Sequence, residues 1–501
     1  MKENITILKK VLLGAVGMSM ALTACTDLNT TEKDSVVINT SGGKFEGDPA
    51  SLLSSVYADL GALTDQANVY ALYEQTTDEM LPPTRGVDWG DNGVWRTLHQ
   101  HTWDPTHQQI LDSWNQLNQR AFKCNQILAS SPSDAQAAEA KFMRAFFMFF
   151  VMDLYGQVPF RNVDEGVDVN PKVMTRSEAF DFIVKDLEEA LPNLSVRGPS
   201  ADNGKASKAS ANFLLAKLYL NKAVYKSAVP EGPYTFDKAD MDKVIGYVDA
   251  ITADGYSFEP QYFDNFRTVA SKELIFTSPS GTPQNRIYMT LHYDQNPSGW
   301  NGFTTVADFY AKFEDNDSRK HAESIAALGK NYYGIKRGFL IGQQYKDDGT
   351  PLVDSRTQKP LVFTEDVPLT GAATNKGIRV IKYHPADQGK YIFFRYADAY
   401  LMKAEAIMRG GTASQTALEM VNALRAVRGA SALGSLNESA MLDERGRELY
   451  WEGVRRTDQI RFGTFTSTWA EKTVTEPFRV LFPIPQQALD SNPNLQPNPG
   501  Y

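Results

Sequence analysis

The sequence predicts a mainly α-helical protein, built from paired helices that pack as tetratricopeptide-like hairpins, with one long loop-rich insertion. Apolar residues recur at a spacing of about 3.6 residues in a series of segments along the chain. Small residues alternate with large ones on one face of several of these segments, which favours close helix packing. After residue 255 the periodicity is lost, and glycine, proline and aromatic residues become dense until about residue 392.

Composition agrees with a large globular protein. The chain has 501 residues, 42% of them hydrophobic and 22% charged, so it can bury a sizeable core and is not disordered. Its 60 acidic residues outnumber 51 Lys and Arg, for a net charge of −9, which argues against a nucleic-acid partner. Two cysteines exclude a disulfide framework.

The first 24 residues predict a secretion signal. Lys2, Lys9 and Lys10 form a basic start, and residues 11–22 follow as an apolar stretch. A bilayer-spanning helix needs about 20 apolar residues, so this stretch is too short to cross a membrane.

The signal ends at Leu22-Thr23-Ala24-Cys25, small residues before a cysteine. That pattern is typical of a bacterial lipoprotein, cleaved before Cys25 and lipidated on its thiol, which anchors the protein to a membrane. Residues 25–41 are then a lipidated tether. The alternative is an ordinary secreted protein in which the cysteine occurs by chance.

Beyond the tether we predict a single domain, residues 42–501. Its helical scaffold covers 42–255 and 395–465, and a loop-rich region at 256–394 is expected to present the ligand or partner surface. The expected helices are Leu52–Leu63, Ile110–Leu128, Phe142–Tyr155, Ala179–Leu191, Ala209–Val224, Val244–Ile251, Ala397–Met408, Ala417–Val427 and Met441–Ile460. The expected strands are Leu274–Thr277, Val380–Tyr383 and Tyr391–Phe394.

Local signals mark some helix ends. We expect Asp134 to cap the third helix and Gly156 to end it, and Ser177 with Glu178 to open the fourth before Pro192 closes it. The hairpin prediction depends on three faces with the same spacing: Ala145, Phe149 and Met152; Ala209, Phe213, Ala216 and Leu220; Ala397, Leu401, Ala404 and Met408. The alternative is three unrelated amphipathic helices.

The last segment, residues 466–501, is predicted to be a non-helical tail. Phe482-Pro483-Ile484-Pro485 is restricted to extended backbone, and Asn-Pro pairs later in the tail favour turns. We expect it to wrap the helical body with Phe482 and Ile484 tucked in.

Charged residues near the end of the scaffold predict a structural network. Glu444, Arg445, Arg447 and Glu448 lie at spacings that allow pairing along one helix. Arg395 with Asp398, and Arg455 with Asp458, are also three residues apart. We interpret these charges as buried Arg–carboxylate pairs that fix helix packing, rather than as catalytic groups.

The candidate ligand site lies in the segment 78–103. Asp78, Arg85 and Asp88 accompany Trp89, Trp95 and Trp103 in a glycine-rich stretch. Aromatic faces can cover the apolar side of a sugar ring while charged and amide groups bind its hydroxyls. The alternative is that these tryptophans belong to the core.

Other chemistry is less well supported. His99, His101 and His107 could suggest zinc, but ordinary packing is the preferred interpretation. Glu273, Asp315 and Asp317 could be imagined as a glycosidase pair, and Asp315-Asn316-Asp317-Ser318 as a calcium loop, without a supporting motif for either. Cys124 is expected to be a buried structural thiol. No metal site and no cofactor are predicted.

Several ordered motifs resemble the SusD/RagB family of Bacteroidetes outer-membrane lipoproteins over nearly the whole chain. They are the lipobox at Cys25, Ser113-Trp114-Asn115, Cys124-Asn125-Gln126-Ile127-Leu128, Arg144-Ala145-Phe146-Phe147, Tyr155-Gly156-Gln157-Val158-Pro159, residues 395–406, Val421-Asn422-Ala423-Leu424-Arg425, residues 444–449, 452–456 and 458–463, and the ending from Phe482 to Tyr501. Pro497 departs from the family pattern, which usually has Gln there.

The resemblance implies a SusD-like fold and a lipid-anchored protein on the outer face of the outer membrane. There it would bind an oligosaccharide without doing chemistry on it and cap a SusC-like TonB-dependent transporter. It also implies that the mid-chain insertion adds ligand aromatics, for which Tyr293 and Trp300 are the first choices, with Tyr332 and then Tyr333 behind them. Our hypothesis is that Arg85, Asp88, Trp89 and Trp300 line one shallow glycan site.

Three functions remain open from the sequence. The first is a surface glycan-binding lipoprotein that delivers its ligand to a transporter. The second is the same scaffold binding peptides for uptake, which the aromatic loop favours less. The third is a lipid-anchored glycosidase.

Overall fold

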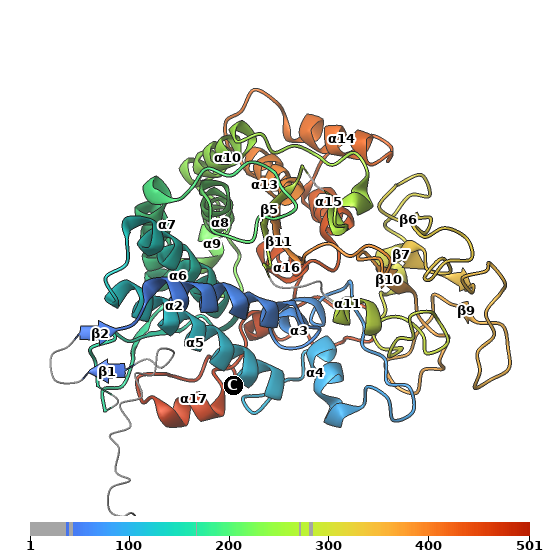
Figure 1. The fold of residues 1–501 in the computed structure, drawn as a ribbon, viewed down its shortest axis with the longest axis horizontal. Helices are drawn as coiled ribbons and strands as arrows, with labels where there is room; N and C mark the ends of the chain where they lie inside the picture. Colours follow the sequence, from blue (N-terminus) through green and yellow to red (C-terminus); the bar gives the residue numbers. More distant parts are fainter. Residues whose placement is uncertain (1–36, 40–43, 167, 270–271, 280–283) are drawn as a thin grey trace, which may run out of the picture.

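A computed structural model describes residues 37–39, 44–166, 168–269, 272–279 and 284–501, and helices dominate it (Figure 1). The helices are α2 Pro49–Ala58, α3 Val69–Glu74, α4 Val94–Gln100, α5 Gln108–Ala129, α6 Asp134–Tyr155, α7 Arg176–Ala190, α8 Lys208–Leu220, α9 Lys222–Tyr225, α10 Lys238–Ala253, α11 Asn285–Tyr288, α12 Ala307–Tyr310, α13 Tyr396–Met408, α14 Ala417–Val427, α15 Glu438–Leu449, α16 Arg455–Arg461 and α17 Gln486–Ser491. Short 3₁₀ helices are η1 Asp59–Thr64, η2 Asp91–Gly93, η3 Leu191–Asn193, η4 Tyr262–Phe266 and η5 Pro477–Val480.

The long helices form one layered half of the molecule. Successive helices α5, α6 and α7 contact one another, and α8, α10 and α13 do the same, as expected of stacked helical hairpins. Every residue of α8 except Lys208 is buried, and α6 carries the buried aromatic residues Phe142, Phe146 and Phe149 into the core. The mainly α-helical fold class is therefore confirmed.

The insertion forms the other half, where loops and short strands replace helices (Figure 1). Its strands are β5 Leu274–Thr277, β6 His321–Ala322, β7 Arg337–Leu340, β8 Gly342–Gln343, β9 Val362–Phe363, β10 Arg379–Ile381 and β11 Ile392–Arg395. The helical half has four more, β1 Val37–Asn39, β2 Lys44–Glu46, β3 Val158–Phe160 and β4 Lys172–Met174. The pairs among these described strands are antiparallel. Strand β11 pairs with β5 and leads directly into α13, which joins the insertion to the scaffold.

Two predicted helix starts are wrong, one by a single residue and the other by two. Helix α6 is capped by Ser133 rather than Asp134, and α7 by Thr175 rather than Ser177. In each case the hydroxyl and the side chain of the residue three positions on form a reciprocal capping box, which favours the earlier start. Gly156, at φ +74°, ends α6 as predicted.

The run predicted as one helix from Met441 to Ile460 is two helices, α15 and α16. Trp451 and Gly453 between them have φ values of +58° and +75°, which no helix tolerates. The break turns the chain so that both helices bring arginine side chains into the same core.

The tail prediction is half right. Phe482 is 0% exposed and Ile484 is 1% exposed, and the Phe482 amide donates to the Leu154 carbonyl at 2.9 Å, so the tail does pack against α6. It is wrong that the tail contains no helix, because α17 forms directly after Pro485. A proline just before a helix supplies a compatible φ and loses no hydrogen bond.

The N-terminal predictions mostly lie outside the described residues, Cys25 and the signal peptide among them. Residues 37–39, at the end of the predicted tether, form β1 and pair with β2. Cys124 is buried, and burial raises the pKa of its thiol, as expected of a structural cysteine. Within the described residues, no helix combines the length and apolar character that crossing a membrane requires.

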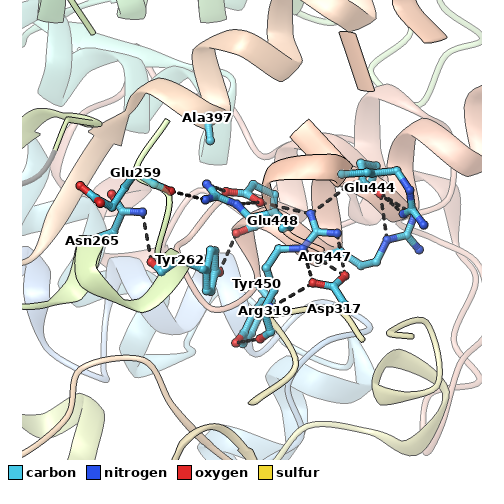
Figure 2. Close-up of polar contacts among 12 residues, drawn as sticks. Glu259, Tyr262, Asn265, Asp317, Arg319, Ala397, Glu444, Arg447, Glu448 and Tyr450 are labelled. Carbon is cyan, nitrogen blue, oxygen red and sulfur yellow. Dashed lines mark hydrogen bonds and ion pairs between the residues drawn. The ribbon is translucent and has the colours of Figure 1, made fainter. Parts of the chain in front are cut away.

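A buried ion network connects the two halves (Figure 2). Arg319, from the insertion, donates to Asp317 at 2.7 Å, to Glu444 at 2.7 Å and to Glu448 at 3.1 Å. Glu448 also accepts from Arg395 and from Arg428, both at 2.8 Å. The side chains of all these residues are at most 1% exposed.

The prediction of a structural network is confirmed, but most predicted partners are wrong. Arg447 does pair with Glu444 along α15. Arg445, however, binds Asp398 and Asp458 on two other helices, and Arg395 binds carboxylates from Glu273, Glu448 and Glu452 rather than Asp398. Burial favours partners that reach across helices, since each charge must be neutralised where it lies.

A second buried charge group is the carboxylate pair of Glu74 and Glu79. Both side chains are fully buried, and each binds a backbone amide, of Gly453 and Trp451 respectively. Burial, and then the neighbouring Glu74 carboxylate, raise the pKa of Glu79 well above its ordinary value. Two such close carboxyl groups share a proton rather than ionise together.

The raised pKa of Glu79 predicts a stability that depends on pH. Because the folded protein holds the proton more tightly than the unfolded chain, this pair favours folding below pH 4.5 and costs stability as pH rises above it. We expect Glu79→Gln, which keeps an amide N–H for Glu74, to be more stable than the unchanged protein at pH 8, by about 1 kcal/mol. Urea unfolding at pH 5 and pH 8 measures this, and an advantage that does not grow with pH would contradict it.

Candidate ligand-binding site

Aromatic side chains from the two predicted loops meet in one cluster, which we call the aromatic cluster: Trp89, Trp95, Trp300 and Phe303. The ring centre of Trp89 lies 5.6 Å from that of Trp95, 6.2 Å from that of Trp300 and 4.6 Å from that of Phe303. The early loop and the mid-chain insertion are thus brought together, as expected.

The backbone is shaped to admit Trp89 at the centre of the cluster. Trp89 has a φ of +62°, and its indole N–H donates to the Trp300 carbonyl at 2.9 Å. Gly302 leaves the necessary space, since a Cβ there would lie 2.4 Å from the Trp89 ring. Strained backbone of this kind is held by its surroundings and is common at ligand sites.

The members of the cluster differ in exposure. Trp95 is 6% exposed and its indole N–H donates to Asp91 at 2.6 Å, so it is a packing residue. Phe303 is fully buried beneath it. Trp300 is 40% exposed, with Tyr288 on one side at 5.7 Å between ring centres, and Trp89 is half-buried. Only Trp300 and part of Trp89 can present a face to a ligand.

Polar groups lie next to this face. The Tyr293 hydroxyl donates to the Asp88 carboxylate, and the Arg356 guanidinium lies 4.0 Å above the centre of the Tyr293 ring. Arg356 also approaches Asp88 at 3.7 Å, and both side chains remain partly exposed, at 55% and 36%. Burial, followed by the hydrogen bond to Asp88, raises the pKa of Tyr293, so its hydroxyl remains a donor. Nothing in the sequence pattern had indicated Arg356.

Arg85 does not lie where the hypothesis placed it. The side chain is 4% exposed and its three guanidinium nitrogens donate to the carbonyls of Asn301, Ala373 and Lys376. Burial lowers the pKa of Arg85 to about 10, so it stays charged at neutral pH. Arg85 therefore positions the loops under the aromatic cluster, and three of its five N–H groups are used by backbone carbonyls.

Three further candidate residues lie apart from the cluster. Asp78 is held by Arg455 through two hydrogen bonds of 2.7 and 2.8 Å, which makes it an ion-pair partner of α16. Tyr332 lines a separate open cavity of about 530 Å³ with Lys330, Asn331 and Pro385. Trp103 is 2% exposed and belongs to the core.

The histidines do not gather into the zinc site that was considered. His99 and His101 are buried, and their ring nitrogens lie next to backbone carbonyls, those of Met80 and Ala470 for His99 and that of Thr76 for His101. Burial lowers the pKa of both, which keeps them neutral. Their ring nitrogens are used in packing the chain rather than pointing at a common centre.

A different group, His292, Asp294 and Asp354, places three possible metal ligands within 4.8 Å of one another. The His292 Nδ1 accepts from the Asp294 amide at 3.2 Å, and burial lowers the pKa of this histidine to about 4. In the neutral ring the proton then lies on Nε2, and the remaining lone pair, on Nδ1, already accepts the Asp294 amide. We assign no metal to this group.

The carboxylates of the imagined glycosidase pair are ion-pair partners in the structure. Glu273 binds Arg395 and Arg428, Asp317 binds Arg319, and Asp315 binds Lys320. Each already faces a cation, and none of these contacts lies at the aromatic cluster. The arrangement at the cluster suits binding through ring faces and hydroxyl-directed hydrogen bonds.

Comparison with known proteins places the chain among SusD-like proteins. The family model described as "SusD family" matches residues 277–476, and one described as "Starch-binding associating with outer membrane" matches residues 41–220. The starch-binding protein SusD of Bacteroides thetaiotaomicron is 24% identical, over 85% of this chain and 84% of that protein. SusD-like protein P25 of Formosa agariphila is 26% identical, over 77% and 78%.

Solved structures share the fold. A SusD superfamily protein from Parabacteroides distasonis superimposes with a TM-score of 0.69 at 20% identity, covering 90% of this chain and 98% of that one. Surface glycan-binding protein A from Bacteroides thetaiotaomicron, solved in complex with laminarihexaose, gives a TM-score of 0.63 at 19% identity, with 90% and 98% covered.

Proposed function

The chain belongs to the SusD-like family, and on that premise we propose that it is a glycan-binding protein whose ligand surface is the aromatic cluster with Asp88, Tyr293 and Arg356. The observation that carries the proposal is the exposed face of Trp300, which is held beside Trp89. The partly exposed side chains of Asp88 and Arg356 lie nearby and can bind sugar hydroxyls. The similarity to a starch-binding protein and to a protein solved in complex with laminarihexaose supports it.

Binding of this kind is suited to capture and release. A half-exposed aromatic face buries only part of a sugar ring, so the affinity per sugar is modest and the complex dissociates readily. We propose that the protein captures an oligosaccharide or polysaccharide and delivers it to a SusC-like TonB-dependent transporter. It does no chemistry on the glycan in this scheme.

Affinity gel electrophoresis tests the binding. The purified protein is run through gels containing neutral polysaccharides (starch, laminarin, galactomannan) or acidic ones (alginate, polygalacturonate). Retardation by at least one of them, without new reducing ends after incubation, is the expected result. New reducing ends would favour a glycosidase instead, and no retardation by any polysaccharide would contradict glycan binding and turn attention to peptides.

We further propose that residues 1–24 are a signal peptide and that Cys25 is lipidated, which would hold the protein on the outer face of the outer membrane through the tether. This gives a prediction with a natural control, because the chain has only two cysteines. Cells labelled with palmitate should incorporate it into the unchanged protein and into Cys124→Ala, but not into Cys25→Ala. Label retained in Cys25→Ala would contradict the anchor.

A further inference from the structure

A polar groove lies directly beside the aromatic cluster, between the η2–α4 segment and the start of α5. Its volume is about 550 Å³, within the range of about 300–1,000 Å³ that is typical of small-molecule sites. Its walls include Asp91, Asn92, Thr102, Asp104, Thr106 and Gln108, all of which are exposed, while the buried Trp103 contributes to its floor.

The groove and the aromatic cluster share a wall. The Asp91 carboxylate accepts the indole N–H of Trp95 at 2.6 Å, and Asp91 also lines the groove. Val94, next to Trp95 in the chain, lines it too. The groove therefore adjoins the aromatic cluster through Asp91, within reach of a chain-like ligand that extends beyond Trp89 and Trp300.

The chemistry of the walls indicates the ligand. The exposed groups are hydroxyls, side-chain amides and two carboxylates, which bind sugar hydroxyls as donors and acceptors. None of the lining residues is Lys or Arg. The Thr106 hydroxyl and then its amide lower the pKa of Asp104, so that carboxylate is ionised at neutral pH. An acidic sugar would be repelled here.

Two other cavities offer less to indicate a ligand. The cleft lined by Phe122, Met148 and Phe160 between α5 and α6 holds about 300 Å³ and is mostly apolar, with nothing to indicate its occupant. The Tyr332 cavity has a single aromatic wall and a lysine, without contact to the aromatic cluster.

We infer that the polar groove is a second subsite of the glycan site, which holds the sugars that follow those on Trp89 and Trp300 and selects neutral glycans over acidic ones. This inference rests on the proposed function. Beyond that function, the groove would set the charge class of the ligand, and it would require glycan chains longer than the aromatic face.

Thr102→Arg tests the subsite, because it places a long cationic side chain across the groove from an exposed position on its wall. We expect retardation by the neutral polysaccharides, measured in gels of starch, laminarin and galactomannan, to weaken at least fivefold. Gln108→Leu, which removes one amide without adding bulk, should weaken it about twofold. Circular dichroism melts verify that both variants fold.

Ser414→Arg is the matched control. Ser414 is exposed in the loop between α13 and α14, so the substitution adds the same charge outside the groove. Unchanged retardation of both groove variants by a neutral polysaccharide would overturn the inference. So would retardation of the unchanged protein by alginate or polygalacturonate alone, a result under which the proposed glycan binding itself would still stand.

Discussion

Replacing Glu448 with alanine is expected to lower the free energy of unfolding by about 3–5 kcal/mol, the usual cost of breaking a buried ion pair from one side. Glu448 is 0% exposed, and its two carboxylate oxygens accept from Arg319, Arg395 and Arg428. Removing the carboxylate would leave three buried guanidinium groups short of a partner, in a place that water does not reach.

The expected loss depends on pH in a defined direction. Burial acts to raise the pKa of Glu448, but Arg428, Arg395 and Arg319 outweigh it and hold that pKa well below the ordinary value of 4.5. The carboxylate thus stabilises the folded protein above pH 4.5, and its contribution is lost only as pH falls through the depressed value. The difference between the variant and the unchanged protein should therefore be constant between pH 6 and pH 8.

Urea unfolding followed by circular dichroism measures the effect. Glu438→Ala is the control, because Glu438 on the same helix α15 also pairs with an arginine, Arg409, but its side chain is 67% exposed. Such an exposed pair contributes little. Equal losses of unfolding free energy in the two variants would contradict the claim that burial makes the network strongly stabilising.

Replacing Trp300 with alanine is expected to weaken glycan binding at least tenfold, a change of about 1.4 kcal/mol. The side chain is 40% exposed and is the most open member of the aromatic cluster, so its removal takes away ligand surface while leaving Trp95 and Phe303 packed below. Interfaces often owe most of their affinity to one such tryptophan.

Isothermal titration with the polysaccharide that retards the protein most gives the affinity, and near-ultraviolet circular dichroism reports the fold. Tyr247→Ala is the control, since Tyr247 is a half-buried aromatic residue on α10, stacked on Tyr219 in the scaffold. Affinity within twofold of the unchanged protein for Trp300→Ala would remove the aromatic cluster as the ligand surface.

Helices and strands could be predicted largely because their signals are local. Apolar spacing located α5 and α6, and a short, mostly apolar run located β5 from Leu274 to Thr277. Where the prediction of one long helix failed, at Trp451 and Gly453, the chain turns to satisfy contacts made far away in sequence, such as the Trp451 amide on Glu79.

The candidate site was only partly predictable, for the same reason. Composition drew attention to Trp89 and Trp300, which the structure does bring together. It could not show that Arg85 donates to backbone carbonyls, because every residue has a carbonyl and the sequence does not say which ones lie near Arg85. Nor could it find Arg356, whose role depends on stacking over Tyr293.

A crystal structure of the protein grown with an oligosaccharide of the polysaccharide it binds best would test the central claim most directly. We predict a sugar ring lying flat against the exposed face of Trp300, with a hydroxyl within hydrogen-bond distance of Asp88 or Arg356. A sugar found elsewhere on the surface, with the Trp300 face left bare, would contradict the account.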